Sequence, residues 1–228
     1  MEARTWIEYI RKPRLKEPVA VVGSPGLRSI GRIAVDYLIQ QLQPELFAEL
    51  YSTHFPIIYQ TSPSYVAQPA FPGQAGVIMR GSHVELPSVK FYASQNPELV
   101  ITRGYHANFD GQYEVAEKVL DLFEEFGVKR MVVLAGYGHE GRDVCCAATD
   151  PSIVEQMEKY GIGIGYIGPF YGFSGLVFGL GKLRGIKGLC LFGRTVPNLE
   201  EPEYPDPEAA KAVLNSLGVI LGIEIKPQ

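Results

Sequence analysis

The chain has 228 residues, of which 46% are hydrophobic and 20% charged, and its formal net charge is −4. These values are ordinary for a globular domain and exclude an intrinsically disordered chain. Basic residues are scattered apart from one N-terminal cluster, so no nucleic-acid partner is predicted. The three cysteines form no CxxC pair and no zinc-ligand spacing. We expect them as reduced thiols of a cytoplasmic protein that has no metal site and no cofactor.

The N-terminal segment is expected to be an arm outside the core. Residues 1–10 lack the apolar stretch of a signal peptide. A basic cluster next to two prolines follows, and such a cluster is usually solvated. We therefore predict one α/β domain over residues 1–228, with an arm at 1–17 and a tail at 222–228. The basic cluster consists of Arg11, Lys12, Arg14 and Lys16.

The first apolar run, residues 18–23, has the continuous pattern of a buried strand. It ends in the turn Gly23-Ser24-Pro25-Gly26, and helical spacing of apolar residues follows at 27–42. A glycine turn between a strand and a helix can bind an anion through the amides at the helix N-terminus. This turn lacks the Gly-Lys-Ser/Thr of a P-loop and the GxGxxG spacing, so a plain tight turn is the favoured interpretation.

The rest of the chain alternates apolar strands with amphipathic helices, after a proline-punctuated middle part of antiparallel character. The middle part is β-rich at 46–59, with short pieces at 75–80 and 89–94. Strands that are apolar on both faces imply a mostly parallel sheet covered by helices on each side. The predicted strands are 99–102, 131–135, 162–167 and 188–192, and the predicted helices are 113–126, 152–160, 175–183 and 208–221.

Two loops carry the side chains best suited to acid–base chemistry or ion binding. Each loop leaves the carboxyl end of a predicted strand, where open α/β sheets bind ligands. Their side chains could line one cleft as base, acid and anion clamp, or could hydrogen-bond a loop or face a partner. They lack an HExxH pattern and a GxSxG nucleophile motif. Because no complete catalytic set is found, we predict that the protein is not an enzyme. The residues are His106 in one loop and His139, Glu140, Arg142 and Asp143 in the other.

The segment 160–181 is uncharged, but eight glycines and Pro169 interrupt it, so it is not expected to span a membrane. We predict a buried strand, a glycine-rich turn and a buried helix. A literal GxGxxG lies at 163–168, but Pro169 follows where a dinucleotide site needs a helix start. Close packing of the glycines within a strand is therefore favoured over dinucleotide binding.

Gly175 and Gly179 form a small-xxx-small pattern on the helix that follows. Each glycine costs a helix about 1 kcal/mol relative to alanine, which suggests that another backbone approaches closely. That backbone belongs either to the domain's own sheet or to another subunit, so both glycines are candidate oligomer contacts. The uncharged segment and the aromatic middle part together predict a homo-oligomer. The aromatic residues concerned are Phe55, Tyr59, Tyr65 and Phe71.

Four stretches of sequence carry a resemblance to a known family. They are VVGSPGLRSIGRIAVDYLIQQL, ELVITRGYHANFDGQYEVAEKVLDLFEEFGVKRMVVLAGYG, IGIGYIGPFYGFSGLVFGLGKLRGIKGLCLFGRT and PDPEAAKAVLNSLGVILGIEI. In this order, over roughly residues 18–225, they resemble the proteasome assembly chaperone 2 family, particularly its archaeal-type members. The resemblance implies a three-layer α/β/α fold akin to nucleoside phosphorylases, with a mostly parallel or mixed sheet. It also implies a homo-oligomer that binds the α subunits of the 20S proteasome.

The C-terminal tail departs from one feature of this family. Some members end in a hydrophobic–Tyr–any tripeptide that docks on the α ring, whereas this chain ends in Lys-Pro-Gln. Gly222 is expected to stop the last helix, and a frayed tail is the usual case for a terminus. We therefore expect a weak contribution to binding from the tail. Its candidate contacts are Ile223, Ile225, Lys226 and the terminal carboxylate of Gln228.

The sequence leaves three functions open. The first is an oligomeric assembly chaperone that binds proteasome α subunits, which explains the incomplete catalytic set. The second is an enzyme on a phosphorylase-like fold that acts on a small polar substrate near His106 and His139, which gives the 137–143 loop a use. The third is a regulator that binds a small molecule in the same cleft without turnover.

Overall fold

The structure is a computed structural model that describes residues 4–55, 77–141, 143–165, 168–200 and 204–226. In these residues nine strands form one mixed sheet, in the order β1-β3-β6-β7-β2-β8-β11-β9-β10. The strands are β1 (Thr5–Tyr9), β2 (Val19–Gly23), β3 (Glu45–Ser52), β6 (Val89–Gln95), β7 (Glu98–Arg103), β8 (Arg130–Gly138), β9 (Val144–Ala148), β10 (Gly163–Ile164) and β11 (Lys187–Thr195). A separate hairpin consists of β4 (Ile78–Arg80) and β5 (His83–Glu85).

The centre of the sheet is parallel and its two ends contain antiparallel pairs. Strands β7, β2, β8 and β11 run in the same direction. Antiparallel pairing joins β1, β3, β6 and β7 on one side and β11 to β9 on the other. The parallel strands are apolar on both faces because helices cover both faces, as the sequence pattern indicated.

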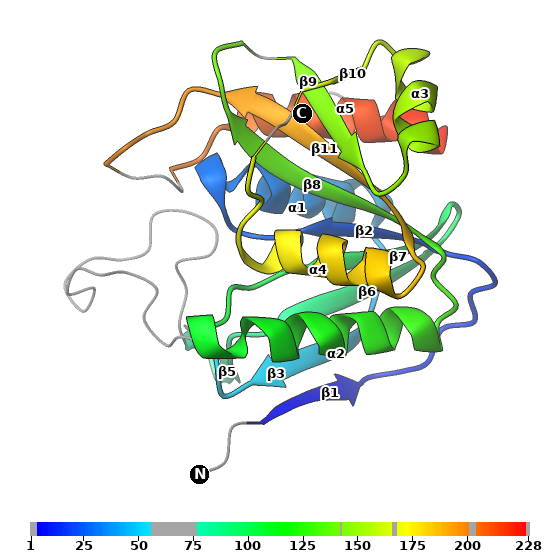
Figure 1. Cartoon of the computed structure of the whole chain (residues 1–228). Helices are drawn as coiled ribbons and strands as arrows, with labels where there is room; N and C mark the ends of the chain where they lie inside the picture. Colours follow the sequence, from blue (N-terminus) through cyan, green and yellow to red (C-terminus); the bar gives the residue numbers. More distant parts are fainter. Residues whose placement is uncertain (1–3, 56–76, 142, 166–167, 201–203, 227–228) are drawn as a thin grey trace.

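Two layers of helices cover the sheet (Figure 1). Helices α1 (Ile30–Leu42) and α5 (Pro207–Leu221) pack on one face, with α3 (Pro151–Glu158) next to the β9 edge. Helices α2 (Gln112–Glu125) and α4 (Gly172–Leu183) pack on the other. The expected α/β/α architecture with a mixed sheet is thus confirmed. In the part of the chain that the structure describes, none of the helices is long and apolar enough to cross a bilayer.

Local sequence signals explain where the later helices begin and end. Asp150 caps α3 by accepting a hydrogen bond from the Ser152 amide. Asp206 caps α5 in the same way through the Ala209 amide, and a proline occupies the first turn of both helices. Gly222 ends α5 in the left-handed conformation, with φ of 68°.

The N-terminal arm was predicted wrongly as a solvated segment. Thr5–Tyr9 form β1, an edge strand that pairs antiparallel with β3. Trp6 stacks on Tyr51 of β3, with ring centroids 5.8 Å apart. The basic cluster that suggested an arm lies after this strand, at residues 11–16, so its charge indicated nothing about the five residues before it.

The glycine-rich segment and the β-rich stretch also differ from expectation. Within the described residues, the predicted buried strand at 162–167 is the two-residue edge strand β10, and residues 166–167 lie outside the described part of the chain. Ile164 is 66% exposed, because β10 is at the end of the described sheet and pairs there with β9 alone. The β-rich stretch from 46 ends as a strand at Ser52, and residues 56–59 lie outside the described part of the chain. Strand β9 was not predicted, because its Cys and Ala residues lack a strong strand pattern.

Candidate functional site

A large cleft lies at the carboxyl ends of the central strands and has a volume of about 1020 Å³. Its position follows from the order of the strands. After β2 the chain continues into one half of the sheet, through β3, β6 and β7, and then crosses to β8 in the other half. Such a change of direction separates the connecting loops and leaves a crevice between them.

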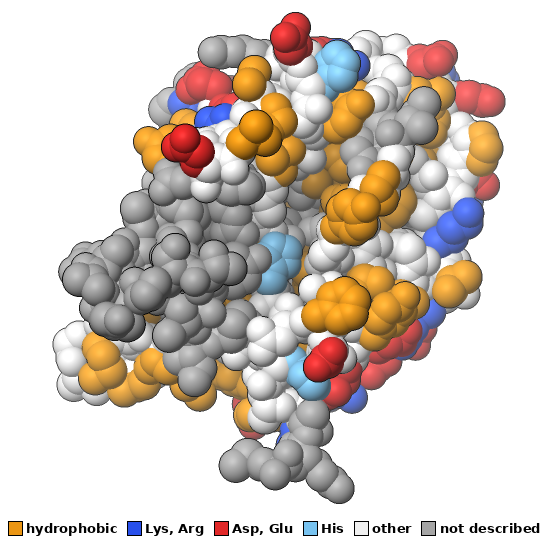
Figure 2. Space-filling view, turned by 60° about the vertical axis from the view of Figure 1, so that its left-hand side comes forward, with side chains coloured by type: hydrophobic (Ala, Val, Ile, Leu, Met, Phe, Trp, Pro, Cys, Tyr) orange, Lys and Arg blue, Asp and Glu red, His pale blue; other side chains and the backbone are white. Residues whose placement is uncertain are grey.

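Three segments wall the cleft, and strand β8 forms its floor. The β2–α1 turn contributes residues 24–27, the loop after β7 contributes residues 106–109 and the segment before α4 contributes residues 169–172. Among the described residues that line the cleft, none is Lys, Arg, Asp or Glu. Figure 2 shows this face of the molecule, where hydrophobic side chains gather beside a recessed histidine. The cleft therefore offers neutral polar groups and aromatic rings.

Glycines allow α1 to sit directly on the sheet below the cleft. A Cβ atom on Gly31 would lie 2.1 Å from the carbonyl oxygen of Leu134, and one on Gly23 would lie 2.1 Å from the carbonyl oxygen of Gly31. Gly26 is different, because a Cβ atom there would meet nothing within 4 Å. Of the two glycines that the sequence singled out, Gly23 is thus required for packing and Gly26 borders open space in the cleft.

His106 lines the cleft as a neutral imidazole. Burial lowers its pKa to about 4, and the positive charge of Arg32 lowers it further, whereas a hydrogen bond donated to the Pro25 carbonyl acts in the opposite direction. At neutral pH the ring therefore carries one donor nitrogen and one acceptor nitrogen. Such a ring can hydrogen-bond a neutral ligand but supplies no positive charge to an anion.

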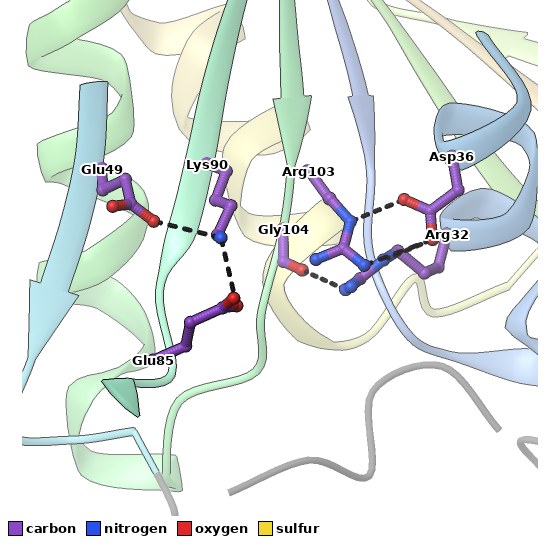
Figure 3. Close-up of polar contacts among 7 residues, drawn as sticks. All are labelled: Arg32, Asp36, Glu49, Glu85, Lys90, Arg103 and Gly104. Carbon is purple, nitrogen blue, oxygen red and sulfur yellow. Dashed lines mark hydrogen bonds and ion pairs between the residues drawn. The ribbon is translucent and has the colours of Figure 1, made fainter. Parts of the chain in front are cut away.

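The buried Arg32, paired with the partly exposed Asp36, holds the loop that carries His106. Arg32 is 5% exposed, and its Nη1 donates to the Gly104 carbonyl at 3.1 Å. Asp36 accepts from Nε of Arg32 at 3.1 Å and from Nε of Arg103 at 2.6 Å, as Figure 3 shows. The Gly104 amide in turn donates to the Gly23 carbonyl at 2.7 Å. Burial and the nearby Arg103 charge lower the pKa of Arg32 to about 10, so the cluster depends on Asp36 for its balance of charge.

The loop after β8 does not join His106 at the cleft, contrary to the sequence hypothesis. Tyr137 and Gly138 line the cleft, whereas His139, Glu140 and Asp143 do not. His139 stacks on Tyr137 with centroids 5.6 Å apart, and its Nδ1 lies 2.8 Å from the Glu140 carbonyl oxygen. Asp143 pairs with Arg194 at 3.2 Å. Arg142 lies outside the described residues.

The structure adds several neutral polar residues to the site. The hydroxyl oxygens of Ser24 and Ser174 lie 2.8 Å apart, within hydrogen-bond distance, and connect the β2–α1 turn to the start of α4. Asn108 and Gln112 line the wall near the start of α2, next to the aromatic residues Phe109 and Tyr171. Apart from Ser24, which belongs to the predicted glycine turn, none of these residues was predicted from the sequence. The signal that could have found them is position, since each lies between a strand end and the first turn of the next helix.

The two glycines of α4 have different surroundings. A Cβ atom on Gly175 would lie 2.1 Å from the Phe170 carbonyl oxygen, so the backbone that approaches it belongs to the same chain. Gly179 is exposed, and a Cβ atom there would meet nothing within 4 Å. Phe55, expected to contribute to an oligomer contact, is 7% exposed and packs edge-on against Tyr105. Tyr59, Tyr65 and Phe71 lie outside the described residues.

The C-terminal segment is docked on the domain as far as Lys226, so the expectation of a frayed tail was wrong for these residues. Ile223 and Ile225 are half-buried against the α1–α5 face of the core. The Gln41 side chain donates to the Glu224 carbonyl at 2.6 Å and accepts from the Lys226 amide at 3.3 Å. Gln228 lies outside the described residues.

Comparison with known proteins reveals relatives over nearly the whole chain. The protein MJ1210 of Methanocaldococcus jannaschii is 28% identical over 224 residues, which cover 92% of this chain and 76% of that protein. The crystal structure of Pyrococcus furiosus PbaB, described as an archaeal proteasome activator, superposes with a TM-score of 0.78. It is 30% identical, and the match covers 97% of this chain and 91% of that one.

A second solved structure has the same fold at lower identity. Pyrococcus furiosus PbaA, described as an archaeal homolog of proteasome-assembly chaperone, superposes with a TM-score of 0.74 at 20% identity, over 96% of this chain and 88% of that one. The sequence profile of the PAC2 family matches residues 20–228, which include the three cleft walls and both helical layers. The chain therefore belongs to the PAC2 family.

Proposed function

We propose that this protein is a proteasome assembly-chaperone-like factor that forms a homo-oligomer and binds proteasome α subunits. The observation that carries the proposal is the 30% identity to PbaB over 97% of the chain, together with the shared fold. PbaB is described as a proteasome activator and PbaA as a homolog of an assembly chaperone. Both descriptions point to the proteasome as the partner of related chains.

An exposed hairpin supports the proposed contact between copies. Strands β4 and β5 pair with each other and stand apart from the main sheet. Met79, Val84 and Leu86 on and beside this hairpin are 69%, 58% and 55% exposed. An isolated two-stranded hairpin is only marginally stable in water, and clustered exposed apolar side chains usually mark an interface. We assign the hairpin to the interface between copies.

The oligomer is tested by charge substitution on the hairpin. Met79→Glu with Val84→Glu should shift the protein toward the monomer, measured by light scattering coupled to gel filtration at micromolar concentration. Val219→Glu is the matched control, because Val219 is 60% exposed on α5, a helix that packs on the main sheet and carries no candidate oligomer contact. A wild-type protein that is only monomeric would contradict the proposal.

Binding to the proteasome is tested with purified α subunits. The wild-type protein should bind immobilised α subunits, and truncation after Lys226 should weaken binding only slightly, because it removes two residues and leaves the docked segment intact. Complete loss of binding with the oligomer unchanged would make the tail the principal anchor. No binding by the wild-type protein would contradict the proposed partner.

We also propose that the cleft does not catalyse a reaction. The support is chemical, since the described lining holds one neutral histidine and no carboxylate to act with it. The test is a panel of nucleosides with phosphate and of simple esters. Turnover that His106→Ala abolishes in a folded protein would contradict this part of the proposal.

A further inference from the structure

We propose that the cleft at the carboxyl ends of β2, β7 and β8 binds an uncharged planar heterocycle that carries both hydrogen-bond donors and acceptors. The inference rests on the cleft alone and does not depend on the proposed binding to the proteasome. Its volume of about 1020 Å³ matches that of small-molecule sites, and it lies at the position where open α/β sheets bind ligands.

The aromatic side chains of the lining favour a planar ligand. Phe109 and Tyr171 both line the cleft, yet they are 88% and 80% exposed. Tyr137 and Phe170 add two further rings to the walls. Covering an exposed aromatic ring with another flat surface is favourable, and stacked or edge-on ring pairs are more favourable than the buried area alone would give. The walls are therefore suited to a ring system.

The polar groups of the lining favour a neutral ligand with mixed donors and acceptors. Asn108 and Gln112 each have amide donors and a carbonyl acceptor, of which one Gln112 donor reaches the Ala107 carbonyl at 3.5 Å. The hydroxyl groups of Ser24 and Ser174 bond each other at 2.8 Å, and Ser24 also lies 3.2 Å from the Pro25 carbonyl oxygen. His106 is neutral at pH 7 because burial lowers its pKa to about 4. None of the described lining residues has a charged side chain to replace the hydration that an ionic ligand would lose.

An anion is the competing ligand, because the N-terminus of α1 reaches the cleft at Gly31. Two observations weigh against it. The buried Arg32 is bound to Asp36 and to the Gly104 carbonyl and is not among the described residues that line the cleft. In addition, the described residues that the β2–α1 turn contributes to the lining include no Lys or Arg. Inorganic phosphate is therefore included as a probe.

The test uses pairs of probes that differ by a carboxylate: uracil against orotate and nicotinamide against nicotinate. Ligand-detected NMR with the full-length protein should give Kd values of about 1 mM or tighter for at least one neutral probe. Its carboxylated partner and inorganic phosphate should bind at least tenfold more weakly. Tighter binding of phosphate or of the carboxylates would overturn the proposal, as would failure of both neutral probes to bind.

Gly26→Leu localises the binding site. A side chain at position 26 enters open space in the cleft, and the backbone there is extended, with φ of 167°, so the variant should fold normally. It should weaken binding of the neutral probe at least tenfold. Gly179→Leu, which also meets open space but lies outside the cleft, should leave binding unchanged. Equal binding by wild type and Gly26→Leu would place the ligand elsewhere and overturn the proposal.

Discussion

The loop after β7 and the loop after β8 follow strands that flank β2, and each carries a histidine, yet only the first histidine lines the cleft. Strand β7 ends at Arg103, which pairs with the last residue of β2, Gly23. Strand β8 pairs with Gly23 at Leu134 and continues beside β11 to Gly138. The second loop therefore begins after Gly138, four residues beyond the β8 residue that pairs with the end of β2, and its His139 does not line the cleft.

The two loops are also held by different ion pairs. Arg32, which holds the first loop, is buried and shares Asp36 with Arg103. The Asp143–Arg194 pair next to the second loop is more open, since the Asp143 side chain is 61% exposed. His106 thus lines the cleft where β7 ends level with β2 and a buried arginine holds the loop, whereas His139 follows a longer strand and lies outside the lining.

The largest expected effect concerns the floor below the cleft. Gly31→Ala should lower the free energy of unfolding by about 3 kcal/mol, because its Cβ would lie 2.1 Å from the Leu134 carbonyl oxygen and neither backbone can move freely. Urea denaturation measures the change. Gly26→Ala, in the β2–α1 turn that precedes α1 and with open space around it, should change stability by less than about 0.5 kcal/mol. Equal effects of the two substitutions would contradict this account of the floor.

The second largest expected effect is the loss of stability when the Asp36–Arg32 pair is broken, compared with the loss when the Asp143–Arg194 pair is broken. Asp36→Ala leaves Arg32 buried without its carboxylate and next to Arg103, so it should cost about 2 kcal/mol, less than a fully buried pair because Asp36 is partly exposed. Asp143→Ala should cost no more than about 0.5 kcal/mol, because an exposed pair contributes little. Thermal unfolding of both variants gives the comparison. A larger loss from Asp143→Ala would reverse the contrast between the loops.

The sequence predicted the central part of the fold from pattern alone. Continuous apolar runs identified the strands that became β2, β7, β8 and β11, since burial on both faces leaves no alternation. The pattern of apolar residues did not predict the strands at the edges of the sheet correctly. Strands β1 and β10 are stabilised by pairing with distant segments, and such pairing cannot be inferred from five or two residues of local sequence.

For the candidate site, the sequence indicated the edge of the sheet at which the cleft lies and a histidine that lines it. His106 was identified because it follows a predicted strand, and the structure places it at the cleft. The same rule failed for His139 because the length of β8 depends on its pairing with β11 as far as Thr195, a tertiary contact. Neutral residues such as Asn108 and Gln112 were missed because their types carry no catalytic signature.

The third effect depends on pH. The pKa of His106 is about 4 in the folded protein and about 6.5 when unfolded, so the unfolded state binds more protons between these values. Stability should be complete above pH 6.5 and fall as the pH drops toward 4, by about 1.5 kcal/mol at pH 4.5 once partial exposure is allowed for. His106→Asn should remove this part of the pH dependence in urea titrations.

The matched variant for the pH experiment is His139→Asn, which changes an exposed side chain outside the cleft. Its stability should follow the wild-type pH profile. If His139→Asn instead flattens the profile and His106→Asn does not, the assignment of the two loops must be exchanged.

The smallest expected effect concerns α4, where one glycine supports the cleft and the other faces outward. Gly179→Ala should raise the free energy of unfolding by up to about 1 kcal/mol, because alanine lowers the entropy cost of an exposed helix position and its Cβ meets nothing within 4 Å. Gly175→Ala should destabilise the protein instead, since its Cβ would lie 2.1 Å from the carbonyl oxygen of Phe170, a cleft residue.

Denaturation and light scattering of both variants show whether Gly179 is a free surface position or a contact between copies. A gain in stability with an unchanged oligomer means that no other chain packs on this glycine. A smaller oligomer for Gly179→Ala would show that a second copy approaches the helix there, and the outer face of α4 would then be an interface rather than a free surface.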